Sequence, residues 1–451
     1  PALPDVWKDS RARGLKETKG RKSVHPSLKI KYKMKRTLLF IALTLALTGI
    51  QAKTKVFKPW SEGKLVVSEN HRYLQTSKGT PFFWLGNTSW LLPERLNRDE
   101  VECFLNKERE AGFNVEQIQV LNAIPTYNVF GQTANNAEFD FKDIDKEGVY
   151  SYWNHLDYIV NMAEQNGIFI AMDCIWGSQI NKMNIKQAQA YGTFLGNRYK
   201  SHSNIIWMMG GDIRGDVHPE IWDALARAIK KVDPNHLMTY HPRGRTTSAT
   251  WFNDREWLDF NMFQSGHRRY GQRSGDGDYT IKENTEEDNW RYVEASQAIN
   301  PLKPVLDGEP SYEDIPQGLH EFNEPRWKDC DIRRYAYWSV FSGAFGHTYG
   351  HNSIMQFMRP GIQPAYGAEK AWWDAIKDPG YNQMKYLKML MLTFPFTERI
   401  PDQTIIVGQN GERYDRIIAT RGNDYMMIYN YSGRPMQIDL TKISGEKKRV
   451  W

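Results

Sequence analysis

Two carboxylates stand directly after short apolar segments, and their type and position suggest acid–base chemistry. Asp212 ends the stretch Asn204-Ile-Ile-Trp-Met-Met-Gly-Gly-Asp212, and Glu309 ends Pro304-Val-Leu-Asp-Gly-Glu309. Hydrolysis of a glycosidic bond needs two such groups, one protonated to donate to the leaving oxygen and one ionised. The pair therefore predicts a hydrolytic site in which Asp212 and Glu309 flank one sugar.

A structural role is the alternative for each acid. Either one could lie in a loop, where it would cap a helix or pair with Arg214 or Arg243. Asp307 precedes Glu309 by two residues and shares its side of the strand, so we interpret Asp307 as a buried structural partner.

Further polar and aromatic residues follow other apolar segments, where they would form one mouth lined with hydrogen-bonding groups and ring faces. Each of them alone is as often a structural residue. No His-Glu-x-x-His or Cys-x-x-Cys spacing occurs, so no metal or other cofactor is expected. The predicted substrate-binding residues are Asn87, Trp90, Asn122, Asp173, Trp176, His241, Arg243, Gln264, His267, Tyr349 and His351.

Strand and helix patterns alternate from about residue 80, and this alternation predicts the scaffold. Eight such units in about 280 residues favour an α/β fold of the (β/α)8 TIM-barrel type, with active residues at the carboxyl ends of the strands. Asp212 would then follow the fourth strand and Glu309 the seventh. A doubly wound open sheet is the rival, but it would carry a glycine-rich phosphate turn near its first strand, which Gly86-Asn-Thr-Ser is not. The expected strands are 82–90, 115–121, 168–176, 204–212, 236–241, 258–264, 304–309 and 346–350, and the expected helices are 97–114, 152–166, 188–199, 219–232, 286–299 and 332–344.

The two ends of the chain differ from this central part. Lys35 and Arg36 precede an apolar run from Leu38 to Leu47, and small residues up to Ala52 follow, which is typical of a secretory signal peptide. The run is too short to span a bilayer as a mature helix, although an internal membrane anchor is the alternative. We expect a bacterial protein that is secreted or periplasmic after cleavage near Ala52. The expected organisation is 1–33 a disordered upstream extension, 34–52 the signal peptide, 53–400 the barrel and 401–451 part of a β domain.

The C-terminal part has strand patterns at 403–407, 414–420 and 425–431, separated by Gly and Asn turns. These patterns predict a small antiparallel β-sandwich domain. Three or four strands are few for a closed sandwich, so the domain is either truncated or packs on the barrel.

Composition sets the remaining limits. Hydrophobic residues make up 40% of the chain, enough for a large core, and the 13% of aromatic residues suit sugar stacking as well as core packing. The net charge of +6 is concentrated in the first 36 residues and gives no case for a nucleic-acid partner. Cys103 and Cys174 fall on a helical and a strand pattern, so both are expected to be buried, unpaired thiols.

Four separated motifs resemble the apiosidase-like family of barrels, glycoside hydrolase family 140. They are Phe83-Trp-Leu-Gly-Asn-Thr-Ser-Trp90, Gly112-Phe-Asn114, Trp207-Met-Met-Gly-Gly-Asp212 and Asp307-Gly-Glu-Pro-Ser-Tyr-Glu313. The resemblance covers about residues 60–451. It implies a (β/α)8 barrel followed by a β-sandwich of the type labelled a collagen-binding domain. It also implies removal of apiose from the pectin rhamnogalacturonan II by a retaining mechanism, with Asp212 as acid/base and Glu309 as nucleophile. Many related barrels place Asn-Glu where Gly211-Asp212 stands here, so this chain has the shorter acid.

These observations predict a monomeric exo-glycosidase that acts on a plant polysaccharide or oligosaccharide and has no membrane span in its mature form. Two alternatives remain open. One is an endo-acting glucanase or mannanase with a long cleft. The other is a non-catalytic protein that binds glycan or a matrix protein, for which one of the two carboxylates would be expected to be missing.

Overall fold

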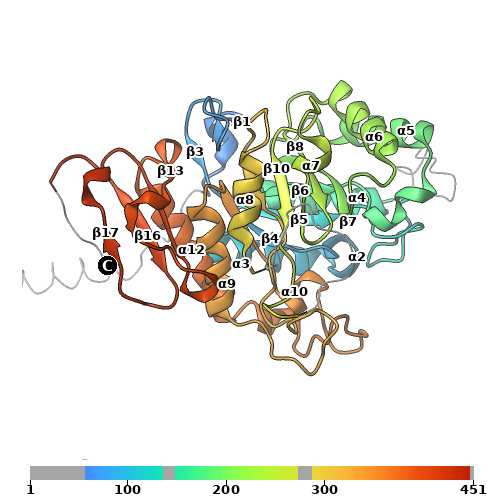
Figure 1. Cartoon of the computed structure of the whole chain (residues 1–451). Helices are drawn as coiled ribbons and strands as arrows, with labels where there is room; N and C mark the ends of the chain where they lie inside the picture. Colours follow the sequence, from blue (N-terminus) through green and yellow to red (C-terminus); the bar gives the residue numbers. More distant parts are fainter. Residues whose placement is uncertain (1–55, 136–147, 273–286, 447–451) are drawn as a thin grey trace, which may run out of the picture. The chain divides into compact units, whose positions relative to one another are not determined.

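A computed structural model describes residues 56–135, 148–272 and 287–446 (Figure 1). The expected extension 1–33 and signal peptide 34–52 lie outside the described residues and stay predictions. Within the described ranges, the helices are too short or too polar to cross a bilayer.

Eight parallel strands form the central sheet, which confirms the predicted barrel fold. Neighbouring strands pair in the order β8-β7-β6-β5-β4-β12-β11-β10, and the two-residue β9 pairs antiparallel with β10. The edges β8 and β10 meet where the Asp259 N–H donates to Met238 O at 2.9 Å and Thr239 Oγ1 donates to Phe260 O at 2.8 Å. The strands are β4 (Trp84–Thr88), β5 (Val115–Gln119), β6 (Phe169–Asp173), β7 (Ile205–Ile213), β8 (Met238–Pro242), β9 (Thr246–Thr247), β10 (Asn261–Gln264), β11 (Val305–Asp307) and β12 (Gly346–Tyr349).

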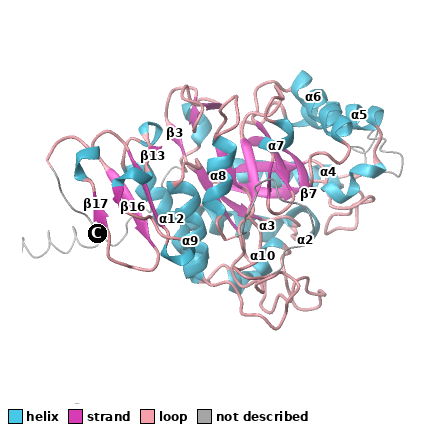
Figure 2. Cartoon of the chain, in the orientation of Figure 1, coloured by secondary structure: helices cyan, strands magenta, loops and turns pink. Residues whose placement is uncertain are grey.

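Helices surround this sheet (Figure 2), and several begin and end at residues suited to capping. Asn97 and Glu100 form a reciprocal capping box at the start of α3, which ends at Gly112 with φ 94°. Ser151 caps α4, which ends at Gly167 with φ 72°. The helices are α2 (Leu92–Arg95), α3 (Arg98–Ala111), α4 (Tyr152–Asn166), α5 (Ile185–Tyr199), α6 (Pro219–Val232), α7 (Ala249–Phe252), α8 (Asn289–Gln297), α9 (Asp329–Phe341), α10 (Asn352–Met355), α11 (Trp372–Ala375) and α12 (Pro379–Thr393).

Two details before the C-terminal sheets differ from the sequence-based expectation. The expected first strand 82–90 is split into β3 (Pro81–Phe82) and β4, because β3 belongs to a separate antiparallel sheet with β1 (Leu65–Val67) and β2 (Leu74–Thr76). Cys103 is exposed and not buried, because the buried face of α3 consists of Val101, Phe104, Leu105, Glu108 and Ala111. Cys174 is a buried free thiol, as expected.

The C-terminal residues form two small antiparallel sheets. One contains β13 (Ile400–Pro401), β15 (Ile417–Arg421) and β16 (Met426–Asn430), and the other contains β14 (Ile406–Val407) and β17 (Gln437–Ile438). Only the last two residues of the expected strand 403–407 are extended, because 403–405 form a 3-10 turn. The Tyr429 ring of β16 stacks on Tyr337 of α9 at 4.7 Å between centroids. This unit therefore packs on the outer helices of the barrel.

Candidate active site

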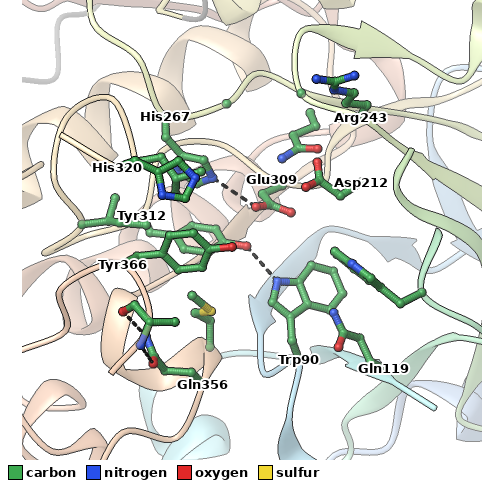
Figure 3. A pocket seen from close by; sticks show the side chains of 18 of the residues that line it. Trp90, Gln119, Asp212, Arg243, His267, Glu309, Tyr312, His320, Gln356 and Tyr366 are labelled. Carbon is green, nitrogen blue, oxygen red and sulfur yellow. Dashed lines mark hydrogen bonds and ion pairs between the residues drawn. The ribbon is translucent and has the colours of Figure 1, made fainter. Parts of the chain in front are cut away.

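A cavity of about 390 Å³ lies where the carboxyl ends of the barrel strands meet. Asp212 and Glu309 both line it, and Figure 3 shows their carboxylates next to each other within it. Strand counting along the sequence thus placed both acids in one pocket. The walls contain Trp90, Leu91, Gln119, Asn122, Trp176, Asp212, Arg243, Gly244, Arg245, Gln264, Gly266, His267, Arg268, Glu309, Tyr312, Ile315, Leu319, His320, Met355, Gln356, Ala365 and Tyr366.

A bulge at the end of β7 directs Asp212 into this cavity. Gly210 pairs with His241 and Ile213 with Pro242, so Gly211 and Asp212 are extra residues on the β7 side. Gly210, Gly211 and Asp212 have φ values of 97°, 95° and 55°. A Cβ atom on Gly210 would lie 2.2 Å from His241 O, so the Gly-Gly pair allows an approach that side chains would prevent. Aspartate tolerates a positive φ better than most residues, which suits it to the third position.

Two histidines hold the carboxylate of Glu309, which follows β11. His267 Nε2 is hydrogen-bonded to Glu309 Oε1 at 3.1 Å, and His241 Nε2 lies 3.2 Å from Oε2. The Asp212 N–H points at His241 Nδ1 at 3.5 Å, so the same imidazole ring lies against both acids. Trp90 packs edge-on against His241 at 5.3 Å between centroids and fixes the imidazole ring.

The two carboxyl groups have opposite pKa shifts. Surrounding protein displaces bulk water from Asp212 and the charge of Glu309 lies nearby, so the pKa of Asp212 rises to about 6. Burial disfavours ionisation of Glu309, but the hydrogen bonds and charge of His241 and His267 outweigh it and lower the pKa of Glu309. Near pH 6 the pocket therefore presents one carboxyl that is partly protonated and one that is ionised. Such a pair can donate a proton and supply a nucleophile or a base.

Tyr312 is a pocket residue that the sequence analysis missed. Its hydroxyl accepts a hydrogen bond from Trp90 Nε1 at 2.9 Å, and its ring packs edge-on against His267 at 4.8 Å. Its position three residues after Glu309 was a usable signal. His320 and Tyr366 were also missed, because they lie in the loops after β11 and β12, where no periodic pattern points to them.

The predicted binding residues fall into three groups. Trp90, Asn122, Trp176, Arg243, Gln264 and His267 line the cavity. His241 lies behind the wall and contacts Glu309. Asn87, Asp173, Tyr349 and His351 are fully buried and are not part of the cavity wall.

These last four residues correct the expectation that every strand-end polar group faces the substrate. Asn87 Nδ2 donates to Glu108 Oε1 of α3 at 3.0 Å, so it faces the helix layer. The Tyr349 hydroxyl donates to Glu313 at 2.6 Å, and His351 pairs with Asp378 at 2.9 Å. Both oxygens of Asp173 lack a side-chain hydrogen-bond partner among the described residues. Asp307 is buried and accepts a hydrogen bond from Ser265 Oγ at 2.9 Å, as expected for a structural partner.

In the described parts of the chain, no group of three or more His, Cys, Asp or Glu side chains is arranged so that it could hold a metal ion. His241, His267 and the two pocket acids are instead engaged with one another.

Comparisons with known proteins give a consistent result. Residues 68–398 match a family model described as "Apiosidase-like, catalytic domain", and residues 400–451 match one described as "Putative collagen-binding domain of a collagenase". A solved structure named "Glycoside hydrolase" is 66% identical, covers 87% of this chain and 88% of its own, and superposes with a TM-score of 0.85. A glycoside hydrolase family 5 structure from Bacteroides vulgatus is 67% identical, with coverages of 87% and 86% and a TM-score of 0.85. No curated protein matches the chain.

Proposed function

This chain belongs to the apiosidase-like family of glycoside hydrolases, and on that premise we propose that it is a retaining exo-glycosidase that releases a terminal apiose-type sugar from a branched pectin such as rhamnogalacturonan II. The observation that carries the proposal is the pair of carboxyl groups in one pocket with opposite pKa shifts. Glycosidases need such a pair, because one group must protonate the leaving oxygen while the other stabilises or attacks the anomeric carbon.

In the first step, a carboxylate oxygen of Glu309 attacks the anomeric carbon as the bond to the leaving oxygen breaks. Asp212 transfers its proton to that oxygen, so the aglycone departs as a neutral alcohol. The raised pKa of Asp212 favours this transfer, and the histidines that hold Glu309 favour its ionised form.

In the second step, the ionised Asp212 takes a proton from a water molecule. The water oxygen attacks the anomeric carbon and displaces Glu309 as a carboxylate. The sugar leaves with its original anomeric configuration, and Asp212 is protonated again for the next cycle.

Two features of the pocket support the choice of substrate. A cavity of about 390 Å³ suits a small ligand, which favours removal of one terminal sugar over binding along a chain. Arg243, Arg245 and Arg268 line the wall, and guanidinium groups bind carboxylates such as those of the acidic sugars in pectin.

The decisive experiment combines variants with product analysis. Glu309→Ala and Asp212→Ala should each remove nearly all release of monosaccharide from pectin fragments, while the melting temperature stays close to that of the wild type. Asp216→Ala is the matched control, because Asp216 is an exposed acid four residues beyond Asp212 that pairs with Arg214. NMR of the first product should show the same anomeric configuration as the substrate. Full activity in either pocket variant, or an inverted product, would contradict the mechanism, and long oligosaccharide products would favour endo action.

We also propose that the protein is exported, since residues 34–52 have the pattern of a signal peptide. Mass spectrometry of the N-terminus of the protein purified from periplasmic and culture fractions tests this. A mature N-terminus just after Ala52 is the expected result, and an uncleaved cytoplasmic protein would contradict it.

A further inference from the structure

The direction of Asp212 depends on the backbone that carries it. Its carboxylate accepts no hydrogen bond from the described residues, and its N–H points at His241 Nδ1 at 3.5 Å. The three consecutive positive φ values from Gly210 to Asp212 therefore set the aim of the side chain. Whatever supports this bulge also controls where the proposed acid/base lies.

Asp173 lies directly against the bulge. It is the last residue of β6, the strand that pairs with β7, and it is fully buried. A Cβ atom added to Gly211 would lie 2.6 Å from Asp173 Oδ2, 2.6 Å from Trp176 Cε3 and 2.9 Å from the Gly177 nitrogen. Gly211 therefore packs directly against the Asp173 carboxyl and the Trp176 ring.

The Asp173 carboxyl has few hydrogen bonds to offset its burial. No side chain among the described residues donates a hydrogen bond to either oxygen, and of their backbone groups only the Ile175 N–H offsets the desolvation of the carboxylate. Burial raises its pKa well above the usual range, and the titratable neighbours Cys174, Tyr191 and Tyr240 are kept neutral by burial as well. A buried carboxyl with so few hydrogen bonds costs stability, so its presence beside an active residue calls for a functional reason.

We infer that Asp173 is a positioning residue, whose carboxyl packs under Gly211 and holds the β7 bulge so that Asp212 points at the leaving oxygen. This inference rests on the proposed role of Asp212 as acid/base. Asp173 touches no reacting atom and acts only through the shape and neutrality of its side chain. An ionised Asp173 would place a negative charge against Gly211, the residue before Asp212.

Shape and charge can be separated by substitution. Asp173→Asn keeps the volume and the neutral state, so the bulge should stay in place. Asp173→Ala leaves space below Gly211, and the bulge should relax into it. Cys174→Ala is the matched control, because it also truncates a buried side chain, directly after β6, and the Cys174 thiol donates to Met172 O within β6 at 3.7 Å.

The test compares two aryl glycosides of the monosaccharide that the wild type releases, one with a dinitrophenyl and one with a methoxyphenyl leaving group. A dinitrophenolate leaves without proton donation, whereas a methoxyphenolate needs the acid. Asp173→Ala should lower kcat/KM about 100-fold for the methoxyphenyl glycoside, as expected for a displaced catalytic group, and leave the dinitrophenyl glycoside nearly unaffected. Asp173→Asn and Cys174→Ala should resemble the wild type on both substrates.

Equal losses on both substrates, no loss at all, or a defect in Asp173→Asn as large as in Asp173→Ala would overturn the inference. If Asp173→Ala does not fold, Asp173→Ser takes its place, with the same expected and contradicting results. Asp212→Ala measured alongside separates the two proposals. If Asp212→Ala loses kcat/KM only on the methoxyphenyl glycoside, Asp212 is supported as the acid, whatever the result for the Asp173 variants. Equal losses of Asp212→Ala on both glycosides contradict the proposed function itself.

Discussion

His267 Nε2 lies 3.1 Å from Glu309 Oε1, and the edge-on contact with Tyr312 keeps the imidazole ring in that position. His241 approaches the second oxygen from another strand at 3.2 Å. Both imidazoles stabilise the negative charge of Glu309, although burial alone would disfavour it. The nucleophile of the proposed mechanism is therefore kept ionised by residues from β8 and from the loop after β10.

The first prediction concerns the acidic limb of the pH profile. His267→Ala should move this limb of kcat/KM to higher pH, because Glu309 loses a partner that lowers its pKa and must still be ionised to react. A lost hydrogen bond to a charged group should also reduce kcat/KM at the optimum by roughly 10- to 100-fold. His320→Ala removes another imidazole from the wall and should leave the position of the limb unchanged. An unmoved limb in His267→Ala would show that Glu309 does not depend on this contact.

The second prediction concerns the basic limb. Asp212 must be protonated to donate, and its pKa is raised to about 6, so kcat/KM should fall about tenfold per pH unit above that value. Glu309→Gln removes a nearby negative charge and should shift the titration of Asp212 to lower pH. Carbon-13 NMR of labelled aspartate measures that shift in the inactive variant. A wild-type plateau that extends to pH 8 would not fit Asp212 as the acid.

The third prediction concerns the bulge itself. Gly211→Ala forces a side chain into a positive φ, at a cost of about 1–2 kcal/mol, and also brings it into contact with Asp173 and Trp176. We expect lower thermal stability and loss of nearly all activity, since Asp212 must move. Gly79→Ala is matched, because Gly79 also has a positive φ of 88° but nothing within 4 Å of the added atom. It should lose some stability and keep its activity, so equal effects of the two variants would argue against a role for the bulge.

Much of the site followed from the order of the strands along the sequence. The carboxyl ends of parallel barrel strands meet at one face, so acids after the fourth and seventh strands were expected to share a pocket. The apolar runs around Trp207 and Leu306 identified those strands, because both faces of a barrel strand are buried and the runs are continuous.

Some predicted binding residues lie outside the cavity, because the order of the strands does not say which face of a strand a side chain occupies. Asn87 and Tyr349 lie near the carboxyl ends of β4 and β12, as expected. Their side chains point away from the cavity, Asn87 to Glu108 of α3 and Tyr349 to Glu313, because side chains alternate between the two faces of a strand. A shift of one residue reverses that assignment, and the sequence pattern does not fix the register so closely. His320 and Tyr366 come from loops, whose course depends on tertiary contacts such as the packing of their two rings at 5.3 Å.

The last prediction concerns a second pair of acids, Glu108 and Glu116, behind β4 and β5. Both are fully buried, and Asn87 and the Tyr381 hydroxyl each donate to Glu108 Oε1 at 3.0 Å. Burial and, for Glu116, the neighbouring charge keep both acids protonated, with the pKa of Glu108 at about 8. The folded protein thus holds protons that the unfolded chain releases above a pKa of about 4.5.

Stability should therefore decrease as pH rises from about 4.5 to about 8, by roughly 1.4 kcal/mol per pH unit for each extra proton that the folded state holds. Glu108→Gln replaces the carboxyl by an amide, whose oxygen still accepts hydrogen bonds but which cannot ionise. The free energy of unfolding of this variant should therefore fall less steeply with pH. Urea denaturation at pH 5, 6, 7 and 8 measures both slopes. Glu110→Gln is the control on the same helix, because Glu110 is exposed and its pKa is lowered by Lys107. Since other buried acids contribute to the absolute slope, the comparison of Glu108→Gln with the wild type decides the outcome. Identical slopes would mean that Glu108 is already ionised in the folded protein.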